Sequence, residues 1–436
     1  MARFYKPAKA KSAPKQVRLD VTALDLEGQG VARHQGRVCF VRGALPGETV
    51  LARVQDAGKK VAKGEVIKVL EASPHRIEPP CEYFGHCGGC QLQHLAGAEQ
   101  LALKSQALVR ELAKQGLAAE TLCPPLVSAP YGYRRTLRLA IKNGLVGLRE
   151  RGSHKLVPIQ HCAIAEPALS ELLPTLLPLV KSLKAKKSLG HLELMALPPY
   201  RVALLRITDS LPGGDIEQLR VWAADQELVL LLQHQGLEQL WPREPIQLGY
   251  ELDGLELGLS GSEFIQVNAA VNEQMVAQAL AWLAPSEHER ILDAFCGLGN
   301  FSLPLARRCK ALVGAEGVKA MTDRAGANAE ANGLGNCRFV TADLDDEQAL
   351  ELLLREPFDA VLLDPARPGA AALCQRLASL PAGTGPGRIL YVSCNPSTFV
   401  RDAALLAQGG YRLDRLGLMD MFPQTGHVET MALLRR

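Results

Sequence analysis

The sequence has little that would point to a membrane or a secreted protein. Its 436 residues contain no apolar run of about eighteen residues, so we expect no membrane-spanning helix. The first residues, MARFYKPAKAKSAPKQVR, lack the apolar core of a secretory signal peptide. Hydrophobic residues at 47% and charged residues at 22% are ordinary for a soluble globular protein. We therefore expect a cytoplasmic protein whose chain forms two or three domains.

Neither sign of charge is in large excess, and the net charge is only +3. Acidic residues are missing before Asp20, however, and the same stretch carries a series of basic residues: Arg3, Lys6, Lys9, Lys11, Lys15 and Arg18. Residues 1–16 are therefore either a solubilising basic tail or an arm that follows a phosphate backbone. The net charge does not choose between these two interpretations.

Eleven cysteines without a secretory signal indicate a reducing compartment. Thiols there serve as metal ligands, nucleophiles or core residues rather than in disulfides. The segment CEYFGHCGGCQLQH places Cys81, Cys87 and Cys90 in a C-x5-C-x2-C pattern. Gly88 and Gly89 let the backbone fold around an ion, so this loop predicts a metal site. A closed tetrahedral site needs a fourth ligand.

The candidates for that fourth ligand are Cys39, Cys123 and Cys162. We favour Cys162, because PIQHCAIAEP is typical of a turn after a strand; His161 and His94 are the next candidates. Four thiolates suit zinc and a [4Fe–4S] cluster equally. The spacing differs from the paired C-x2-C of most zinc ribbons, which favours a [4Fe–4S] cluster with a structural role.

Periodicity divides the remaining chain into three regions. Residues 17–76 alternate apolar and polar side chains between glycine turns, which predicts a small β-barrel of the type that binds oligonucleotides. Residues 77–260 contain the helical stretch AEQLALKSQALVRELAKQG and later β-hairpins rich in arginine, so we expect an α+β central domain. Residues 261–436 alternate strand, loop and helix, which predicts a doubly wound parallel α/β sheet.

A nucleotide site is predicted at the start of that sheet. RILDAFCGLGNFSLPLA is a strand, a glycine loop and a helix, but Ser302 replaces the third glycine of the dinucleotide fingerprint and Asp293 precedes the loop. The next three strands end in Glu316, Asp343 and Asp364, at the edge where open α/β sheets bind ligands. Acids suit ribose hydroxyls, an adenine amine and a free ammonium. We therefore expect S-adenosylmethionine rather than NAD.

The strand RILYVSCNP brings Cys394 to the same edge of the sheet, where Pro396 ends it and Ser393 and Asn395 flank the thiol. A buried core cysteine is the alternative interpretation, and Cys296 in the cofactor loop is the rival nucleophile. The other cysteines of this domain lie on predicted surface or helical segments: Cys309, Cys337 and Cys374.

A thiol at this position indicates methylation at C5 of a pyrimidine. Addition of a thiolate at C6 makes C5 nucleophilic enough to accept a methyl group. A base must then remove the C5 proton before the thiol is eliminated. In DMFPQTGHVETMALL we favour Glu429, which is shielded at the start of the last strand. His427 is the competitor, with a model-compound pKa near ~6.5.

Together these motifs resemble the RNA uracil-C5 methyltransferase family, in particular its iron–sulfur-containing bacterial 23S rRNA branch with an N-terminal TRAM domain. The similarity is carried by EGQGVAR, CEYFGHCGGCQ, SEFIQVNAAVN, LDAFCGLGNFSLPLA, LLDPARPGA, VSCNP and DMFPQTGHVE. It implies C5-methylation of a specific uridine in 23S rRNA, free or partly assembled, with S-adenosylmethionine as methyl donor. No membrane and no obligate protein partner are expected. At Ala294, related chains often carry a larger apolar residue, and we expect only a packing change.

The resemblance also implies roles for individual residues. Cys394 would be the nucleophile and Glu429 the base. A [4Fe–4S] cluster would be bound by four cysteines: Cys81, Cys87, Cys90 and Cys162. The cofactor would be contacted by Gln266, Phe295, Asn300, Glu316, Asp343 and Asp364. Phe264 would stack near the target base, and we expect Arg134 to contact the RNA.

The sequence leaves other functions open. The chain could be a non-catalytic TRAM-type RNA-binding protein with a zinc knuckle, although the intact Cys394 and Glu429 argue against this. Cytosine-C5 methyltransferases also use a thiol, but their RNA members typically have two catalytic cysteines, and no second thiol follows LLDPAR. Another 23S rRNA uridine or a tRNA uridine is a closer alternative, although tRNA uracil methyltransferases usually lack the barrel and the cluster.

Overall fold

The computed structural model describes residues 15–56, 60–381 and 383–436. The chain forms two compact units. Of the described residues, the first unit comprises those within 1–80, Cys90–Leu108 and Gln424–His427, and the second comprises those within Cys81–Gly89, Val109–Pro423 and Val428–Arg436. Of the predicted basic tail, only Lys15 and Gln16 belong to the described residues, and they open the first strand. None of the helices in the described ranges is long and apolar enough to cross a membrane.

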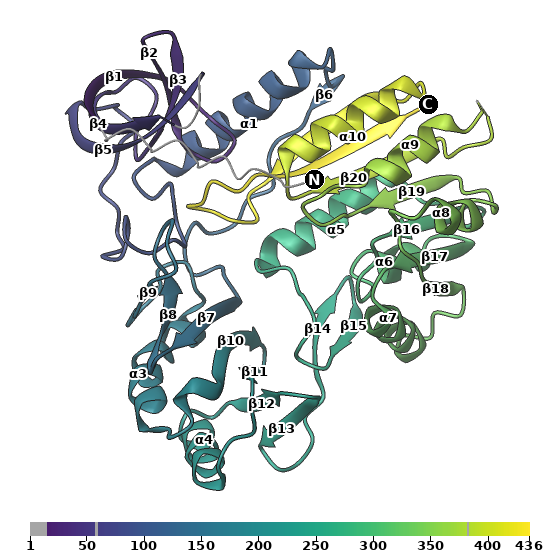
Figure 1. Cartoon of the computed structure of the whole chain (residues 1–436). Coiled ribbons are helices and arrows are strands. Elements are labelled where there is room, and N and C mark those ends of the chain that lie inside the picture. The colour runs from purple at the N-terminus through teal and green to yellow at the C-terminus, as the bar shows by residue number, and fades with distance from the viewer. Residues whose placement is uncertain (1–14, 57–59, 382) are drawn as a thin grey trace, which may run out of the picture. The chain divides into compact units, whose positions relative to one another are not determined.

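The alternating residues of the first unit form a closed barrel, drawn in purple in Figure 1. Its order over the described residues is β1–β2–β3–β5–β4, and only β3 and β5 pair in parallel. The strands are β1 Lys15–Leu24, β2 Gly30–His34, β3 Arg37–Arg42, β4 Thr49–Asp56 and β5 Val61–Glu71. Alternate side chains such as Leu19, Val21, Cys39 and Val41 fill its core. This confirms the predicted N-terminal β-barrel.

The first unit also contains a loop from the far end of the chain. The backbone N–H of Leu92 donates to the carbonyl of Gln424 at 2.9 Å. Gln100, in helix α1 (Gly97–Lys114), donates from Nε2 to Gln424 Oε1 at 3.0 Å. Gly426 lies against the barrel so closely that a Cβ there would be 2.2 Å from the carbonyl oxygen of Glu27. Segment 424–427 is therefore packed into the barrel unit, directly before the last strand.

In the second unit, residues 136–241 form a sheet covered by helices on one face. Its order within the described chain is β13–β12–β11–β10–β7–β8–β9. The strands are β7 Thr136–Lys142, β8 Leu145–Arg149, β9 Leu156–Val157, β10 Leu189–Leu197, β11 Tyr200–Ile207, β12 Val229–Gln233 and β13 Leu237–Trp241. The helices are α2 Pro167–Ser170, α3 Leu173–Ser182 and α4 Gly213–Asp225, with a 3-10 turn at Lys186–Ser188. Leu139, Leu194 and Leu230 pack under these helices, whereas Val202 and Leu204 face a second core.

That second core belongs to the C-terminal sheet, whose order over the described residues is β18–β17–β16–β19–β20–β22–β21–β6. The strands are β16 Arg290–Ala294, β17 Ala311–Glu316, β18 Cys337–Thr341, β19 Ala360–Leu363, β20 Arg388–Ser393, β21 Arg412–Met419, β22 Glu429–Arg435 and β6 Thr121–Leu122. Strands β16 to β20 are parallel, and β22 is antiparallel to its two neighbours. The strand order reverses between β16 and β19, where doubly wound sheets bind ligands.

Helices complete the C-terminal layer structure seen in Figure 1. They are α5 Ala269–Leu283, α6 Ser302–Ala306, α7 Lys319–Ala331, α8 Glu347–Leu353, α9 Ala371–Ser379 and α10 Pro396–Gln408. Helix α5 packs on β20 and β22, and α9 packs against α10. A hairpin of β14 (Leu248–Leu252) and β15 (Leu255–Leu259) precedes them. This confirms the predicted C-terminal α/β domain, although the helix predicted after the glycine loop is only the short α6.

Candidate active site

Strand register brings the predicted nucleophile and base together. In the antiparallel pair β20–β22, Ser393 is opposite Thr430. One further step along this register places Cys394 across from Glu429, and the two side chains are close enough that the charge of Glu429 raises the pKa of the Cys394 thiol. On the other side of β20, the parallel strand β19 ends at Leu363, and Asp364 follows it. The sheet therefore brings three segments that are distant in sequence to one edge.

The residues after Cys394 begin a helix and hold a neighbouring loop. Asn395 is the N-cap of α10, and its Oδ1 accepts from the N–H of Ser397 at 3.1 Å. Pro396 occupies the first turn, where its missing N–H has no consequence. The Nδ2 of Asn395 donates to the carbonyl of Arg367 at 3.0 Å. The same dipeptide thus ends the strand, starts the helix and ties the thiol to the loop that carries Asp364.

Burial and neighbouring charges shift the protonation of this group. Burial, with the charge of Asp364, raises the pKa of Glu429 to about 8, while Arg367 lowers it. Burial also raises the pKa of the Cys394 thiol to about 11, helped by Glu429 and Asp364 and opposed by Arg367. Burial raises the pKa of Asp364 to about 7. Glu429, with 9% of its surface exposed, is therefore a stronger base than an ordinary carboxylate.

The rival residues have less suitable surroundings. Cys296 is buried in the cofactor loop, and burial, Asp293 and Glu316 raise its pKa well above the ordinary value. His427 is exposed and lies in the first unit. The structure corrects one expectation about the other thiols, because Cys309 is buried after α6 and Cys337 opens β18 rather than lying on the surface. Cys374 is buried in α9, as a helical position predicts.

The predicted cofactor loop has a distorted backbone. Phe295 has a φ of 67° although it is not a glycine, and Gly297 and Gly299 have φ values of 55° and 103°. A non-glycine residue with positive φ is strained and occurs often at ligand sites. Directly before the loop, Asp293 is fully buried and accepts a hydrogen bond from Ser302. Burial raises the pKa of Asp293 to about 7, an effect that Ser302 opposes.

The other predicted cofactor acids lie at the same edge. Glu316 ends β17, and its Oε1 accepts from the N–H of Val318 at 3.1 Å. Asp343 is exposed two residues beyond β18 and accepts from the N–H of Asp345 at 3.0 Å. Strands β17 and β18 run parallel to β16. Both acids and the glycine loop after β16 therefore lie at the same edge of the sheet, the one formed by the carboxyl ends of these strands.

Residues predicted to contact RNA lie near the surface. Phe264 is 67% exposed, which is unusual for a large aromatic side chain. The guanidinium of Arg134 lies 5.9 Å from the ring centre of Phe422, and its Nε donates to the carbonyl of Thr136 at 2.8 Å. A stacking surface and a part-exposed cation are therefore available in the second unit.

Three of the four predicted cluster cysteines lie in the second unit. Their thiols are close enough that Cys81 and Cys162 raise the pKa of Cys87, after the larger effect of burial. Tyr83 joins the two segments, because its hydroxyl accepts from the N–H of Gln160 at 3.1 Å and its ring centre lies 5.5 Å from that of His161. Cys90 belongs to the first unit. Within the described ranges, no three His, Cys, Asp or Glu side chains are arranged around one metal ion.

The alternative ligands have other roles. Cys39 is buried in the barrel core, and His94 is buried in the first unit. Cys123 follows β6, and burial raises the pKa of its thiol. His161 pairs with Glu82 at 3.3 Å.

Comparison with known proteins identifies the family. A tRNA (Uracil-5-)-methyltransferase model matches residues 257–436, and a TRAM domain model matches residues 15–67. The 23S rRNA (uracil(1939)-C(5))-methyltransferase RlmD of Aeromonas salmonicida is 44% identical over 444 residues, covering 100% of both chains. The enzyme of the same name from Pseudomonas aeruginosa PAO1 is 44% identical over 429 residues, covering 96% of this chain and 94% of that one. The chain belongs to the RlmD family of RNA uracil-C5 methyltransferases.

Membership of the RlmD family confirms the resemblance to RNA uracil-C5 methyltransferases with a TRAM domain. It also sets aside the non-catalytic and cytosine-C5 alternatives. The solved complex of Pyrococcus abyssi tRNA (uracil-54, C5)-methyltransferase with S-adenosyl-L-homocysteine is 26% identical, with a TM-score of 0.74, covering 96% of this chain and 100% of that one. Coverage this complete includes the barrel. The expectation that tRNA enzymes lack a barrel does not hold for this relative, so the barrel alone does not separate rRNA from tRNA enzymes.

Sequence reasoning missed some residues that shape the RlmD-family site. Arg367 lowers the pKa of both Glu429 and Cys394, and its position three residues after Asp364 was the available signal. Tyr250 was also missed, because it lies in a hairpin before the α/β domain. Its hydroxyl donates to Asn300 Oδ1 at 3.1 Å, and Asn272 exchanges two amide hydrogen bonds of 3.0 Å with Asn300.

A buried arginine connects the same network to the predicted cofactor contact Gln266. Arg135 donates from Nε to the carbonyl of Gln266 at 2.7 Å, and its guanidinium lies 4.7 Å from the ring centre of Tyr250. Burial raises the pKa of Tyr250 to about 12, so its hydroxyl remains a donor at neutral pH. Gln266 and Asn300 are 34 positions apart in the sequence. One set of contacts, through Arg135 and Tyr250, connects them.

Proposed function

We propose that this protein transfers the methyl group of S-adenosylmethionine to C5 of a uridine in 23S rRNA, at the position numbered 1939 in the names of its relatives. The observation that carries the proposal is the juxtaposition of Cys394 and Glu429 across β20 and β22. The full-length identity of 44% to enzymes with that name supports the choice of RNA. The target uridine must be flipped out or unpaired, which favours free or partly assembled RNA.

The proposed reaction begins when the Cys394 thiolate adds to C6 of the uracil. The electron pair of the C5–C6 double bond moves into an enolate, so C5 becomes nucleophilic. C5 then attacks the methyl carbon of the cofactor, and the carbon–sulfur bond of the sulfonium breaks to leave S-adenosylhomocysteine. Glu429 removes the C5 proton, the C5–C6 double bond reforms, and the thiolate leaves.

The charges around Cys394 fit this order of events. A base works best when its pKa is close to the working pH, and burial brings Glu429 to about 8. The ionised form of Glu429 accepts the C5 proton, and a pKa of about 8 leaves part of Glu429 ionised at neutral pH. Arg367 opposes the two carboxyl groups by lowering the pKa of the thiol. We propose that Arg367 keeps part of the thiol reactive in a site that otherwise disfavours its ionisation.

The cofactor would bind at the glycine loop and the strand-end acids. We propose contacts from the following residues: Gln266, Phe295, Asn300, Glu316, Asp343 and Asp364. The acids at this edge offer acceptors for ribose hydroxyls and for amino groups, and the positive φ of Gly297 and Gly299 lets the backbone approach a ligand closely. Phe264 would stack on a base near the target, and Arg134 would contact the RNA.

We further propose that the cysteine loop holds a [4Fe–4S] cluster through Cys81, Cys87, Cys90 and Cys162. Cys81 raises the pKa of both Cys87 and Cys162, and Cys162 also raises that of Cys87, after the larger effect of burial; this proximity supports a shared site. Each thiolate of such a cluster binds a different iron, so its ligands are more widely spread than those of one ion. That spread is compatible with the lack of a single-ion site in the described chain. The cluster would supply structural cross-linking of residues 81–90 to Cys162.

The domains proposed to carry these functions are the barrel (17–76), the central domain (77–260) and the methyltransferase domain (261–436). The function is tested by mapping 5-methyluridine in ribosomal and transfer RNA from cells with and without this protein. We expect one 23S rRNA uridine to lose its methyl group and the tRNA positions to be unchanged. Loss of the methyl group from a tRNA uridine alone would favour the tRNA alternative.

A further inference from the structure

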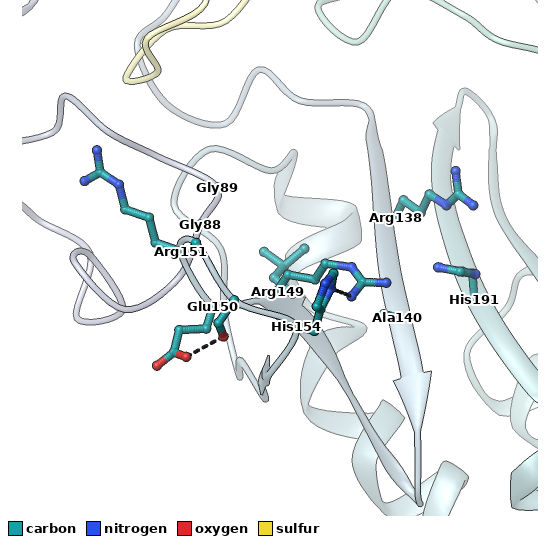
Figure 2. A pocket seen from close by; sticks show the side chains of 12 residues that line it. Gly88, Gly89, Arg138, Ala140, Arg149, Glu150, Arg151, His154 and His191 are labelled. Carbon is teal, nitrogen blue, oxygen red and sulfur yellow. Dashed lines mark hydrogen bonds between the residues drawn. The ribbon is translucent and has the colours of Figure 1, made fainter. Parts of the chain in front are cut away.

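A positively charged pocket lies on the central sheet, in a region to which the proposed reaction gives no role. The cavity has a volume of about 670 Å³. Its basic lining residues are Arg138, Arg149, Arg151, His154 and His191, and we call this cavity the basic pocket. Figure 2 shows Arg138 and His191 on neighbouring strands, with Arg149 and His154 facing them. Glu150 and Arg151 are directed away from these side chains.

Strand pairing builds this pocket. Arg138 lies on β7 and His191 on β10, which are neighbouring antiparallel strands. Arg149 ends β8, which pairs with the other side of β7. The cysteine loop, residues 81–90, supplies the facing wall. The N–H of Gly88 donates to the carbonyl of Arg149 at 2.9 Å, and the backbone of Cys87 pairs with that of Glu150 in an antiparallel β-bridge. The backbone of these arginines is therefore fixed by strand pairing and by hydrogen bonds to the cysteine loop.

The field inside the basic pocket is positive. Its one acidic lining residue, Glu150, accepts from the hydroxyl of Ser153 at 2.6 Å. Burial lowers the pKa of His191, and the neighbouring charges of Arg138 and Arg149 lower it further. Glu193 opposes this effect, but it is shared between Arg138 at 3.4 Å and Arg206 at 3.2 Å. A bound anion would offset the repulsion between the positive charges of Arg138 and Arg149.

The lining points to phosphate rather than to bases. Among the described residues that form the pocket there is no Phe, Tyr or Trp, and its aromatic rings are those of His154 and His191. Arginine guanidinium groups and glycine backbone suit phosphate oxygens, which carry charge but no sequence information. The volume lies within the range of ligand pockets in proteins, so more than one phosphate of a strand has room.

We propose that the basic pocket binds the phosphodiester backbone of the RNA substrate, outside the target nucleotide. The proposal rests on the proposed function for the identity of the RNA. The pocket would position the RNA and contribute to affinity without choosing the base. Because one wall is the cysteine loop, the loop would act on RNA binding through Arg149, whose backbone it fixes.

The test compares RNA binding by the whole protein and by the double variant Arg138→Ala/Arg149→Ala. For single-stranded RNA, each lost phosphate contact lowers the slope of log affinity against log salt by about 0.7. We expect the slope to fall by about 1.4 and the affinity at 0.15 M salt to fall roughly tenfold. The matched control, Lys181→Ala/Arg243→Ala, removes the same charge outside the pocket and should bind like the unaltered protein. Arg138→Lys/Arg149→Lys should regain most of the affinity.

Binding of S-adenosylmethionine and thermal unfolding show whether each variant is folded. If the double variant is unfolded, Arg138→Ala replaces it, because Glu193 keeps Arg206 as a partner; its slope should fall by about 0.7. A folded variant that keeps the full slope, or a control that loses as much, overturns the basic pocket. Failure of the unaltered protein to methylate 23S rRNA would instead contradict the proposed function and leave the binding result standing.

Discussion

At the scale of single residues, burial makes this site chemically unusual. Burial raises the pKa values of Glu429, Asp364 and Cys394. The charge of Asp364 raises those of Glu429 and Cys394 further. The same effect has a cost in stability, since a carboxyl group that is harder to ionise in the folded state favours unfolding once the pH is high enough to ionise it. Function and stability therefore oppose each other at this edge.

Replacing Glu429 with Gln should stabilise the protein at alkaline pH. The pKa of Glu429 rises from 4.5 to about 8 on folding, so the folded state binds the proton more tightly than the unfolded state. The free energy of unfolding is unaffected below pH 4.5 and falls as the pH rises from 4.5 to 8. Glu429→Gln should remove this loss, with a gain on the order of 4 kcal/mol at pH 8 and none at pH 4. Thermal unfolding at both pH values measures it, with the exposed Glu330→Gln as control.

The roles of Cys394 and Glu429 predict opposite outcomes for covalent complexes with RNA. Cys394→Ala should give no methylation and no adduct, because no bond to C6 forms. Glu429→Gln should add and methylate but retain the C5 proton, so a protein–RNA adduct should accumulate. RNA with 5-fluorouridine at the target should trap the unaltered enzyme in the same way. Denaturing gels with labelled RNA give the readout.

A matched control for that experiment is Cys296→Ala, which should still form the adduct. An adduct formed by Cys394→Ala would remove this residue from the mechanism and make Cys296 the candidate nucleophile. Full turnover by Glu429→Gln would give the role of base to another group, with His427 the first to examine.

At the scale of elements, the link between β16 and α6 needs glycine for a reason the structure makes explicit. Gly299 has a φ of 103°, and a Cβ there would lie 2.2 Å from Cδ1 of Leu303. The loop reaches the ligand edge only with this backbone conformation. Gly299 is therefore needed for the backbone to connect β16 to α6, in addition to any role of the loop in binding a ligand.

Gly299→Ala should lower the affinity for S-adenosylmethionine at least tenfold, because the loop must shift to relieve both the contact and the backbone strain. Isothermal titration calorimetry measures the affinity. Gly335→Ala is the control, since a Cβ there meets nothing within 4 Å. Equal affinities in the two variants would show that the loop does not contact the cofactor.

At the scale of the whole molecule, segments far apart in the sequence share compact units. Segment 424–427 packs with the barrel, two residues before the predicted base Glu429. The cysteine loop likewise joins Cys162 through Tyr83 and His161. Each compact unit is therefore built from segments that their positions in the sequence do not suggest as neighbours.

The proposed cluster predicts the colour and the metal content of the protein. Anaerobically purified protein should be brown, with iron and sulfide near four per chain for a [4Fe–4S] cluster. Cys87→Ser should lose the colour and much of the solubility. Structural metal sites contribute on the order of several kcal/mol of folding free energy, and this variant would lose that contribution. Cys123→Ser should keep both. Zinc without iron in the anaerobic protein would contradict the cluster.

The sequence by itself determined the barrel, the α/β domain and the chemical class of the site. Alternation and the strand–loop–helix order reflect local geometry, and Cys394, Glu429 and the strand-end acids were each identified from the ends of single strands. This works because parallel strands necessarily deliver their carboxyl ends to one edge.

Only the tertiary structure decided which side chains modify one another. That Glu429 lies across from Cys394 follows from the pairing of β20 with β22, whose partners are separated by the long α10–β21 excursion. Arg367, Tyr250 and the basic pocket likewise depend on long-range pairing between strands and loops. Burial and charge are properties of the packed neighbourhood, and no local pattern in a sequence records which distant residues will form it.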